Sequence, residues 1–125
     1  MWHFVPLFEN RRILQTKFCN VVVQGDHVYG LSDGILECVD LAGGQRVWKG
    51  GRYAQGQILG VGDLLLVQAE SGAVALVEAT PAGHRELGRF SALKDKTWNN
   101  PSLYGRFLLV RNAEQAACYE LAVEP

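Results

Sequence analysis

The sequence predicts an all-β protein made of about three four-stranded antiparallel blades, the last of them incomplete. Short apolar runs bounded by Gly, Asp and Asn dominate the chain, a pattern typical of β-strands. A glycine-turn-strand pattern recurs at intervals of roughly 40 residues, the length of one propeller blade. Helical periodicity is nearly absent, and the best helix candidate, residues 8–17, carries charges on all sides. Together these observations predict a partial β-propeller.

Length and composition fit a single domain over residues 1–125. The chain has 125 residues, 48% hydrophobic and 20% charged, and a formal net charge of −1. A near-neutral charge gives no basis for binding nucleic acid or an anionic membrane surface. No apolar run approaches the roughly 20 residues of a membrane-spanning helix. We therefore expect neither nucleic acid nor membrane insertion among the functions of this protein.

Three turn glycines mark the repeat. Gly25, Gly62 and Gly105 each precede a short apolar run, and a second apolar run follows after another turn signal. A tight hairpin needs positive φ, which glycine adopts without strain, so we expect these glycines to be structural anchors. The second runs end alike, at residues 38–41, 76–79 and 118–121.

The repeat sets the predicted blade boundaries. Blade one covers about residues 18–49, blade two about 55–90 and blade three about 97–121, and residues 1–17 are left as a spare outer strand with its connection. Strands are expected near residues 18–23, 27–31, 35–41 and 45–49, near 55–61, 64–69, 73–79 and 84–90, and near 101–103, 107–111 and 116–121.

The clearest hairpin lies within residues 38–48. Gly43 and Gly44 allow the positive φ of a two-residue turn, and Asp40 just before them can accept backbone N–H bonds. Trp48 is large and stiff and stands at a fixed distance beyond the turn, which makes it a packing anchor toward a neighbouring blade. We therefore interpret Asp40, Gly44 and Trp48 as structural residues.

The predicted number of blades is too small for a closed ring. A closed propeller needs at least about four blades, or roughly 160 residues. Three alternatives remain open: several copies complete a ring as a homo-oligomer, the chain is a piece of a longer propeller, or the blades form an open stack with exposed edges.

The motif in residues 25–30 and 38–48 resembles the repeat of PQQ-binding-like β-propellers. That family's blade runs roughly G-x-x-V-Y and then A-x-D-x-x-T-G-x-x-x-W. This sequence reads Gly-Asp-His-Val-Tyr-Gly and then Cys-Val-Asp-Leu-Ala-Gly-Gly-Gln-Arg-Val-Trp. Cys38 replaces the usual Ala, and Gly43 replaces the usual Thr.

The resemblance covers most of residues 5–121 and implies a fold and a set of functions. It implies a propeller fold and a tryptophan-docking role for Trp48. It also favours the bacterial periplasm or cell envelope, the setting of the family's outer-membrane-assembly lipoprotein, although this chain shows no signal peptide. The family's dehydrogenases use an adjacent cysteine pair, whereas Cys19, Cys38 and Cys118 stand apart here.

The predicted function is therefore a non-catalytic binding or scaffold module for protein or small-molecule partners. We expect no catalytic residue, and PQQ as a cofactor rests on the resemblance alone. The alternative is a fragment of a PQQ-dependent oxidoreductase. We also expect no metal site, because the three histidines His3, His27 and His84 lack metal-ligand spacing.

The connections that lead into the first strand of each blade form the predicted ligand-facing region. Loops held at one end of a rigid scaffold are favoured places for ligand contacts, and these three should converge. The alternative is that they serve only packing and chain connection. The candidates are Asn20, Arg52, Tyr53, Gln55, Trp98 and Asn99.

Overall fold

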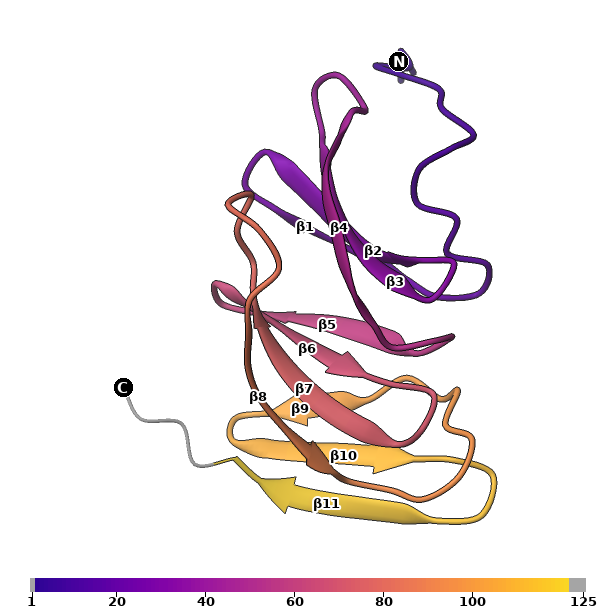
Figure 1. Ribbon diagram of the computed structural model, residues 1–125, viewed down its shortest axis with the longest axis vertical. Helices are drawn as coiled ribbons and strands as arrows, with labels where there is room; N and C mark the ends of the chain where they lie inside the picture. The colour runs from indigo at the N-terminus through magenta and orange to yellow at the C-terminus, as the bar shows by residue number, and fades with distance from the viewer. Residues whose placement is uncertain (1, 122–125) are drawn as a thin grey trace.

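The protein is a stack of three antiparallel β-sheets, each of them one blade of a partial propeller (Figure 1). The computed structural model describes residues 2–121, which form eleven strands. Blades one and two have four strands each, and blade three has three in the order β11-β10-β9. The predicted fold class, with its incomplete third blade, is thereby confirmed. The strands are β1 (Val21–Gln24), β2 (His27–Ser32), β3 (Ile35–Asp40), β4 (Arg46–Arg52), β5 (Gln57–Val61), β6 (Leu64–Gln68), β7 (Ala73–Glu78), β8 (Glu86–Ser91), β9 (Ser102–Tyr104), β10 (Phe107–Arg111) and β11 (Ala116–Glu120).

The first hairpin of each blade has the same geometry. Gly25 and Gly62 both have a φ of 60°, and Gly105 has a φ of 58°. Each is the first of two residues between paired strands, where a type II′ turn requires positive φ. One further hydrogen bond repeats in every blade, from the residue after the third strand to the residue after the turn glycine. Its donors and acceptors are Leu41 N and Asp26 O, Ala79 N and Asp63 O, and Leu121 N and Arg106 O.

The hydrophobic core lies between the blades. Successive side chains of a strand point to opposite faces of its sheet. In β6, Leu65 and Val67 pack toward blade one, where they join Tyr29. Leu66 points the other way and packs with Leu108 of blade three. Because β6 is buried on both faces, its sequence is a continuous apolar run rather than an alternating one.

Trp48 lies at the junction of blades one and two. Its ring centroid is 6.1 Å from that of Tyr29 and 5.9 Å from that of His84, in the second case edge to face. Its Nε1 donates a hydrogen bond of 2.8 Å to the carbonyl oxygen of Thr80. Trp48 therefore ties the outer strand of blade one to the β7–β8 connection of blade two.

The turn after β3 is longer than the two-residue hairpin expected from the sequence. Residues 41–45 separate β3 from β4, and Gly44, but not Gly43, has positive φ, at 67°. The Asp40 carboxylate stabilises this turn, since its Oδ2 accepts the N–H of Gly43 at 3.2 Å and its Oδ1 accepts that of Ala42 at 3.4 Å. The side chain of Asp40 favours this wider loop because it satisfies the loop's own N–H groups.

Residues 8–17 do not form a helix. Leu14 and Lys17 have φ values of 50° and 55°, whereas a right-handed helix requires φ near −60°. Within residues 2–121 the structure contains no helix, and so none of the length and apolarity that crossing a membrane needs.

The outer strand expected within residues 1–17 is also absent from the described part of that segment. Residues 2–20 form no strand and lie beyond blade one, whereas the unpaired edge strand β11 lies at the opposite end of the stack (Figure 1). Residues 12–14 are held on blade one by the side chains of Glu37 and Arg46 rather than by pairing along a strand edge, which explains the difference.

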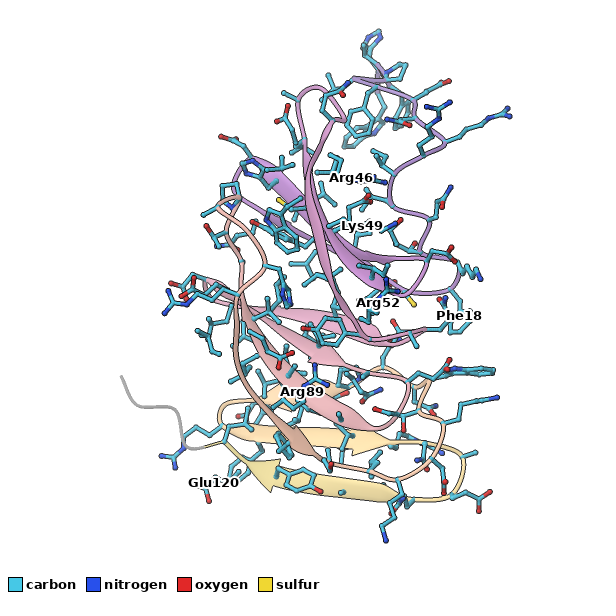
Figure 2. All side chains as sticks on the ribbon, viewed as in Figure 1. Phe18, Arg46, Lys49, Arg52, Arg89 and Glu120 are labelled. Carbon is cyan, nitrogen blue, oxygen red and sulfur yellow. The ribbon has the colours of Figure 1, made fainter. Side chains whose placement is uncertain are left out.

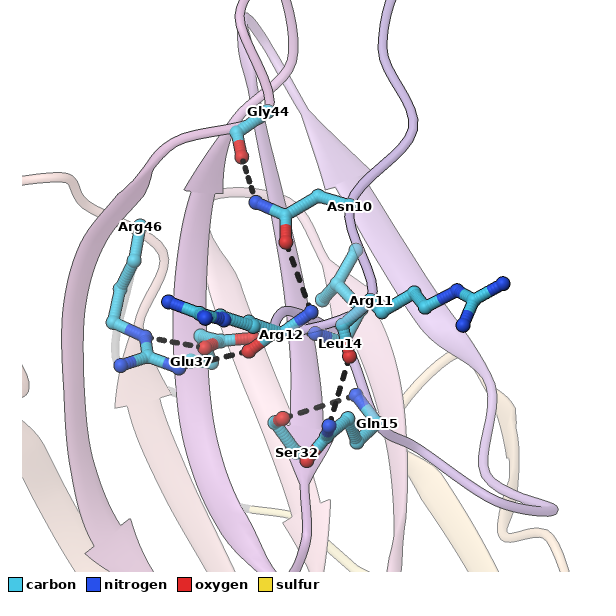
Figure 3. A network of polar contacts seen from close by, with 9 residues as sticks. All are labelled: Asn10, Arg11, Arg12, Leu14, Gln15, Ser32, Glu37, Gly44 and Arg46. Carbon is cyan, nitrogen blue, oxygen red and sulfur yellow. Dashed lines mark hydrogen bonds and ion pairs between the residues drawn. The ribbon is translucent and has the colours of Figure 1, made fainter.

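A buried carboxylate holds the N-terminal segment on blade one (Figure 3). The Glu37 side chain is fully buried on the face of β3 turned away from blade two. Its Oε1 accepts the backbone N–H of Leu14 at 2.7 Å, and its Oε2 accepts Nε–H of Arg46 at 2.6 Å. Arg46 in turn donates to the carbonyl oxygen of Arg12 at 3.0 Å. The ion pair therefore satisfies the buried charge and fastens residues 12–14 to the sheet.

Candidate functional site

The connections that lead into the first strands of the three blades meet around the side chain of Gln57, at the start of β5. Its Oε1 accepts the backbone N–H of Asn20 at 3.4 Å. Its Nε2 lies 3.5 Å from the carbonyl oxygen of Phe18 and 3.3 Å from that of Trp98, and donates to both. A single buried amide thus links the entries into blades one and three to blade two.

Two further glutamine side chains lie in the same region. Gln68, at the end of β6, is fully buried and donates from Nε2 to the carbonyl oxygen of Asn99. The Oε1 atoms of Gln55 and Gln68 are buried and have no hydrogen-bond donor among the described residues. Unpaired buried acceptors are costly, so this end of the molecule carries polar groups that its own fold does not satisfy.

Trp98 is both packed and accessible. Its ring meets that of Phe18 edge to face at 5.5 Å between centroids, and its Nε1 donates to Oε2 of Glu70 at 2.6 Å. The ammonium group of Lys96 lies over the ring at 4.6 Å from its centroid. With 46% of its surface exposed, Trp98 offers an aromatic face that is held in place on two sides.

Beside Trp98 an open groove of about 580 Å³ runs across the end of blade two. Its lining carries three cationic side chains, Arg52, Arg89 and Lys96, and two carboxylates, Glu70 and Asp95. Arg52 and Lys96 form no ion pair with any of the described residues, while Arg89 is paired with Glu86. Arg52 and Arg89 are labelled in Figure 2. The lining residues are Arg52, Tyr53, Ala54, Ala69, Glu70, Ser71, Arg89, Asp95 and Lys96.

Tyr53 forms the buried floor of the groove. Its hydroxyl donates to Oε1 of Glu86 at 2.8 Å and lies 2.9 Å from Nε2 of His84. Since the hydroxyl has one proton, His84 is the donor in the second contact. Burial is the main cause that raises the pKa of Tyr53, and the Glu86 carboxylate adds to it. Tyr53 therefore stays protonated and acts as a packing and hydrogen-bonding group.

Arg89 completes this cluster. Its Nε and Nη2 donate to the two oxygens of Glu86 at 3.0 and 2.7 Å, and its guanidinium lies over the Tyr53 ring at 5.5 Å. The hydrogen bonds from Arg89 are the main cause that lowers the pKa of Glu86, and the one from Tyr53 helps. A carboxylate held ionised in this way stabilises the groove wall but is a poor general acid.

The predicted site residues therefore fall into two groups. Arg52 and Tyr53 line the groove, whereas Asn20 and Asn99 are held next to Trp98 by the buried Gln57 and Gln68 amides. Sequence reasoning missed four charged residues that line the groove. Glu70 and Arg89 are many positions away from the predicted ones, whereas Asp95 and Lys96 lie within three positions of Trp98.

The chemistry-bearing residues elsewhere do not converge. Within residues 2–121 no three side chains of His, Cys, Asp or Glu come together as ligands for a metal ion. Burial raises the pKa of the Cys19 and Cys38 thiols, which makes them weak nucleophiles. Asp40 and Glu120 belong to separate blades. Asp40 stabilises a turn, and Glu120 forms an ion pair with Arg106.

Comparison with known proteins identifies likenesses of fold. No protein-family model and no curated protein matches the chain. Among solved structures, the computationally designed Ika8 protein is similar with a TM-score of 0.62 and 9% identity, covering 81% of this chain and 32% of the designed one. The computationally designed Ika4 protein is similar with a TM-score of 0.62 and 10% identity, covering 82% and 64%. The chain thus spans about a third of one designed protein and just under two thirds of the other, and it shares with them a fold of stacked β-sheets.

Proposed function

We propose that this chain is part of a propeller of the PQQ-binding-like type and works as a non-catalytic binding or scaffold module. The observation that carries the proposal is the groove at the end of blade two, where loops from all three blades gather. Arg52 and Lys96 bring positive charge without an intramolecular carboxylate partner, and Trp98 adds an accessible aromatic face. Ligand sites typically combine an apolar or aromatic surface, which provides affinity, with a few polar groups that fix the orientation of the ligand.

The two cations without an ion-pair partner, Arg52 and Lys96, favour a ligand with carboxylate groups, either an acidic peptide or a small organic acid. An Arg guanidinium and a Lys ammonium both form charge-assisted hydrogen bonds with carboxylates. An exposed aromatic ring next to them buries apolar surface of the same ligand. The Glu86 carboxylate is held ionised by Arg89, and the Tyr53 hydroxyl is bonded to Glu86 and His84, which is why binding rather than catalysis is proposed.

The test is an NMR titration of the full ¹⁵N-labelled chain with an acetylated tetra-aspartate peptide and with citrate. We expect the shifts to concentrate at residues 52–54, 70–71 and 95–98. Arg52→Ala combined with Lys96→Ala should weaken binding by at least about tenfold, since each charge-assisted hydrogen bond contributes about 1.5–3 kcal/mol.

The matched control is Arg85→Ala, an equally exposed arginine on the β7–β8 connection, at the other end of blade two. It should leave binding unchanged. Trp98→Ala should weaken binding of the peptide. The proposal is wrong if neither probe binds, or if binding is insensitive to Arg52→Ala, Lys96→Ala and Trp98→Ala.

The oxidoreductase alternative requires a site for PQQ with its Ca²⁺ ion. The residues present do not fit that group, because the sequence has no adjacent cysteines and the described residues offer no cluster of three metal-ligating side chains. We derive no step through it. Mixing the protein with PQQ and Ca²⁺ and following quinone absorbance and dye reduction decides the matter, and stoichiometric quinone binding would favour the oxidoreductase.

A further inference from the structure

Blade three has an unpaired edge and an uncovered face. Its counterparts in the other blades, β3 and β7, each lie between two strands, whereas β11 pairs with β10 alone in residues 2–121. An edge strand of this kind presents unpaired N–H and C=O groups to any segment that can extend along it.

The uncovered face is the one that packs against the next blade elsewhere in the stack. The fourth residue after the turn glycine is Tyr29 in blade one, Leu66 in blade two and Leu109 in blade three. The first two are 1% and 0% exposed, because a following blade covers them, but Leu109 is 49% exposed. Phe107 and Tyr104, on the same side of blade three, are also exposed. The stack therefore ends on a surface built to receive one more blade.

The N-terminal segment enters blade one as a connection from a preceding blade would. Between blades one and two, the backbone N–H of Glu70, in the β6–β7 turn, donates a hydrogen bond of 3.0 Å to the carbonyl oxygen of Tyr53. Tyr53 directly follows β4, the outer strand of blade one. The corresponding turn of blade one repeats this contact, since Asp33 N donates 3.0 Å to the carbonyl oxygen of Gln15. By this equivalence, the residues before Gln15 enter blade one from the side on which the outer strand of a preceding blade would lie.

The first residues of this segment project away from their own chain. Phe8 packs on Gly44, and from residue 8 onward the segment is fastened to blade one. Before it, Trp2 and Phe4 are 88% and 89% exposed, and Val5 and Leu7 are exposed as well. This mostly apolar stretch of six residues is as long as β3 or β7, yet it is paired with no strand.

We propose that residues 2–7 of one copy of this chain add to β11 of a second copy and complete its blade three as the fourth strand. The exposed face of that blade then packs against the side of blade one that carries residues 8–17. The chain cannot do this for itself, because the N-terminal segment and β11 lie at opposite ends of the stack (Figure 1). The contact is head to tail, so it closes into a ring only if the rotation allows. Two copies would supply six blades, within the usual range of about four to eight for closed propellers.

The first test is the mass of the full chain in solution, by light scattering after size exclusion over a range of concentrations. We expect a discrete oligomer. Trp2→Ser combined with Phe4→Ser should raise its dissociation constant by at least about tenfold, because two aromatic side chains lose their burial. Leu87→Ser removes a half-exposed apolar side chain from β8, outside the proposed contact, and should leave the mass unchanged.

The second test locates the added strand. Cys118 lies exposed on β11, and its repeat equivalent Cys38 is paired in register with Trp48 of the outer strand β4. Single cysteines placed in turn at positions 2–7 should cross-link to Cys118 of a second copy under diamide at the one position that faces Cys118, because a disulfide needs Cα atoms within about 7 Å and the two neighbouring side chains point to the other face. Ser71→Cys, in an exposed turn at the end of blade two, should not cross-link.

Several outcomes would overturn this proposal. A chain that stays monomeric at high concentration has no second copy on β11, and the uncovered blade then belongs to another protein or to a further segment of chain. An oligomer whose dissociation constant is unchanged by Trp2→Ser with Phe4→Ser, or in which no position from 2 to 7 cross-links to Cys118, uses a different surface. Binding of peptide or citrate at Arg52 and Lys96 is measured independently, so either proposal can fail without the other.

Discussion

At the scale of single residues, glycines restrict the chain in two different ways. Gly62 has open space where a Cβ would lie, so only its φ of 60° requires glycine. Gly56 is restricted by contact, since a Cβ there would come within 1.9 Å of the carbonyl oxygen of Gln68. The first glycine shapes a hairpin, and the second lets the entry loop approach the β6–β7 turn beneath the groove.

Gly62→Ala should lower the free energy of unfolding by about 1 kcal/mol, the cost of placing an alanine in the left-handed region. Gly88→Ala is the matched control, because Gly88 also has open space but no positive φ, and it should cause no loss. Urea unfolding followed by circular dichroism measures both. Equal losses for the two variants would show that strain at the turn is not the cause.

At the scale of elements, a buried ion pair substitutes for strand pairing. The N-terminal segment has no sheet neighbour, and its attachment to blade one depends on Glu37, which bonds the Leu14 N–H and the Arg46 side chain. Glu37 is fully buried and Arg46 is 43% exposed, so replacing Glu37 removes charge-assisted hydrogen bonds at a buried position, which is costlier than losing an exposed pair.

Glu37→Gln should cost about 1.5–3 kcal/mol of stability, the contribution of hydrogen bonds to a charged group, and should speed hydrogen exchange at the Leu14 amide far more than at amides of β6 or β7. Hydrogen exchange followed by NMR gives both quantities. Glu120→Gln is the control, because the ion pair of Glu120 with Arg106 is exposed, and a loss of less than about 1 kcal/mol is expected there. Unchanged exchange at Leu14 would mean that other contacts hold the segment.

At the scale of the whole molecule, stability is shared between neighbouring blades only. The two hydrophobic clusters join blade one to blade two and blade two to blade three. A stack of this kind behaves as a chain of units with interfaces between nearest neighbours, so its last unit can open before the rest.

Leu66→Ala should therefore cost about 2–5 kcal/mol and should release the amides of β10 before those of β2. Native-state hydrogen exchange resolves the two strands. Leu109→Ala changes the equivalent position of blade three and should cost less than about 1 kcal/mol in the monomer, where Leu109 is half exposed. Simultaneous opening of β2 and β10 in Leu66→Ala would show one cooperative unit instead.

The sequence by itself determined the strands, the turns and the number of blades. Turn glycines and short apolar runs act over neighbouring residues, and a hairpin register follows from its turn, so Gly25, Gly62 and Gly105 could be aligned without coordinates. The entry connections could be found in the same way, because they fall between predicted blades.

Only the tertiary structure decided what those connections form together. The groove combines Arg52 with Glu70, Arg89 and Lys96, which meet through blade stacking and leave no local pattern. Residues 8–17 were a helix candidate in the sequence, but their place depends on a distant carboxylate, Glu37, which leaves no local pattern. Whether a face such as that of Leu109 is covered depends on which blade stands next to it, and that is a property of the assembled stack rather than of any stretch of chain.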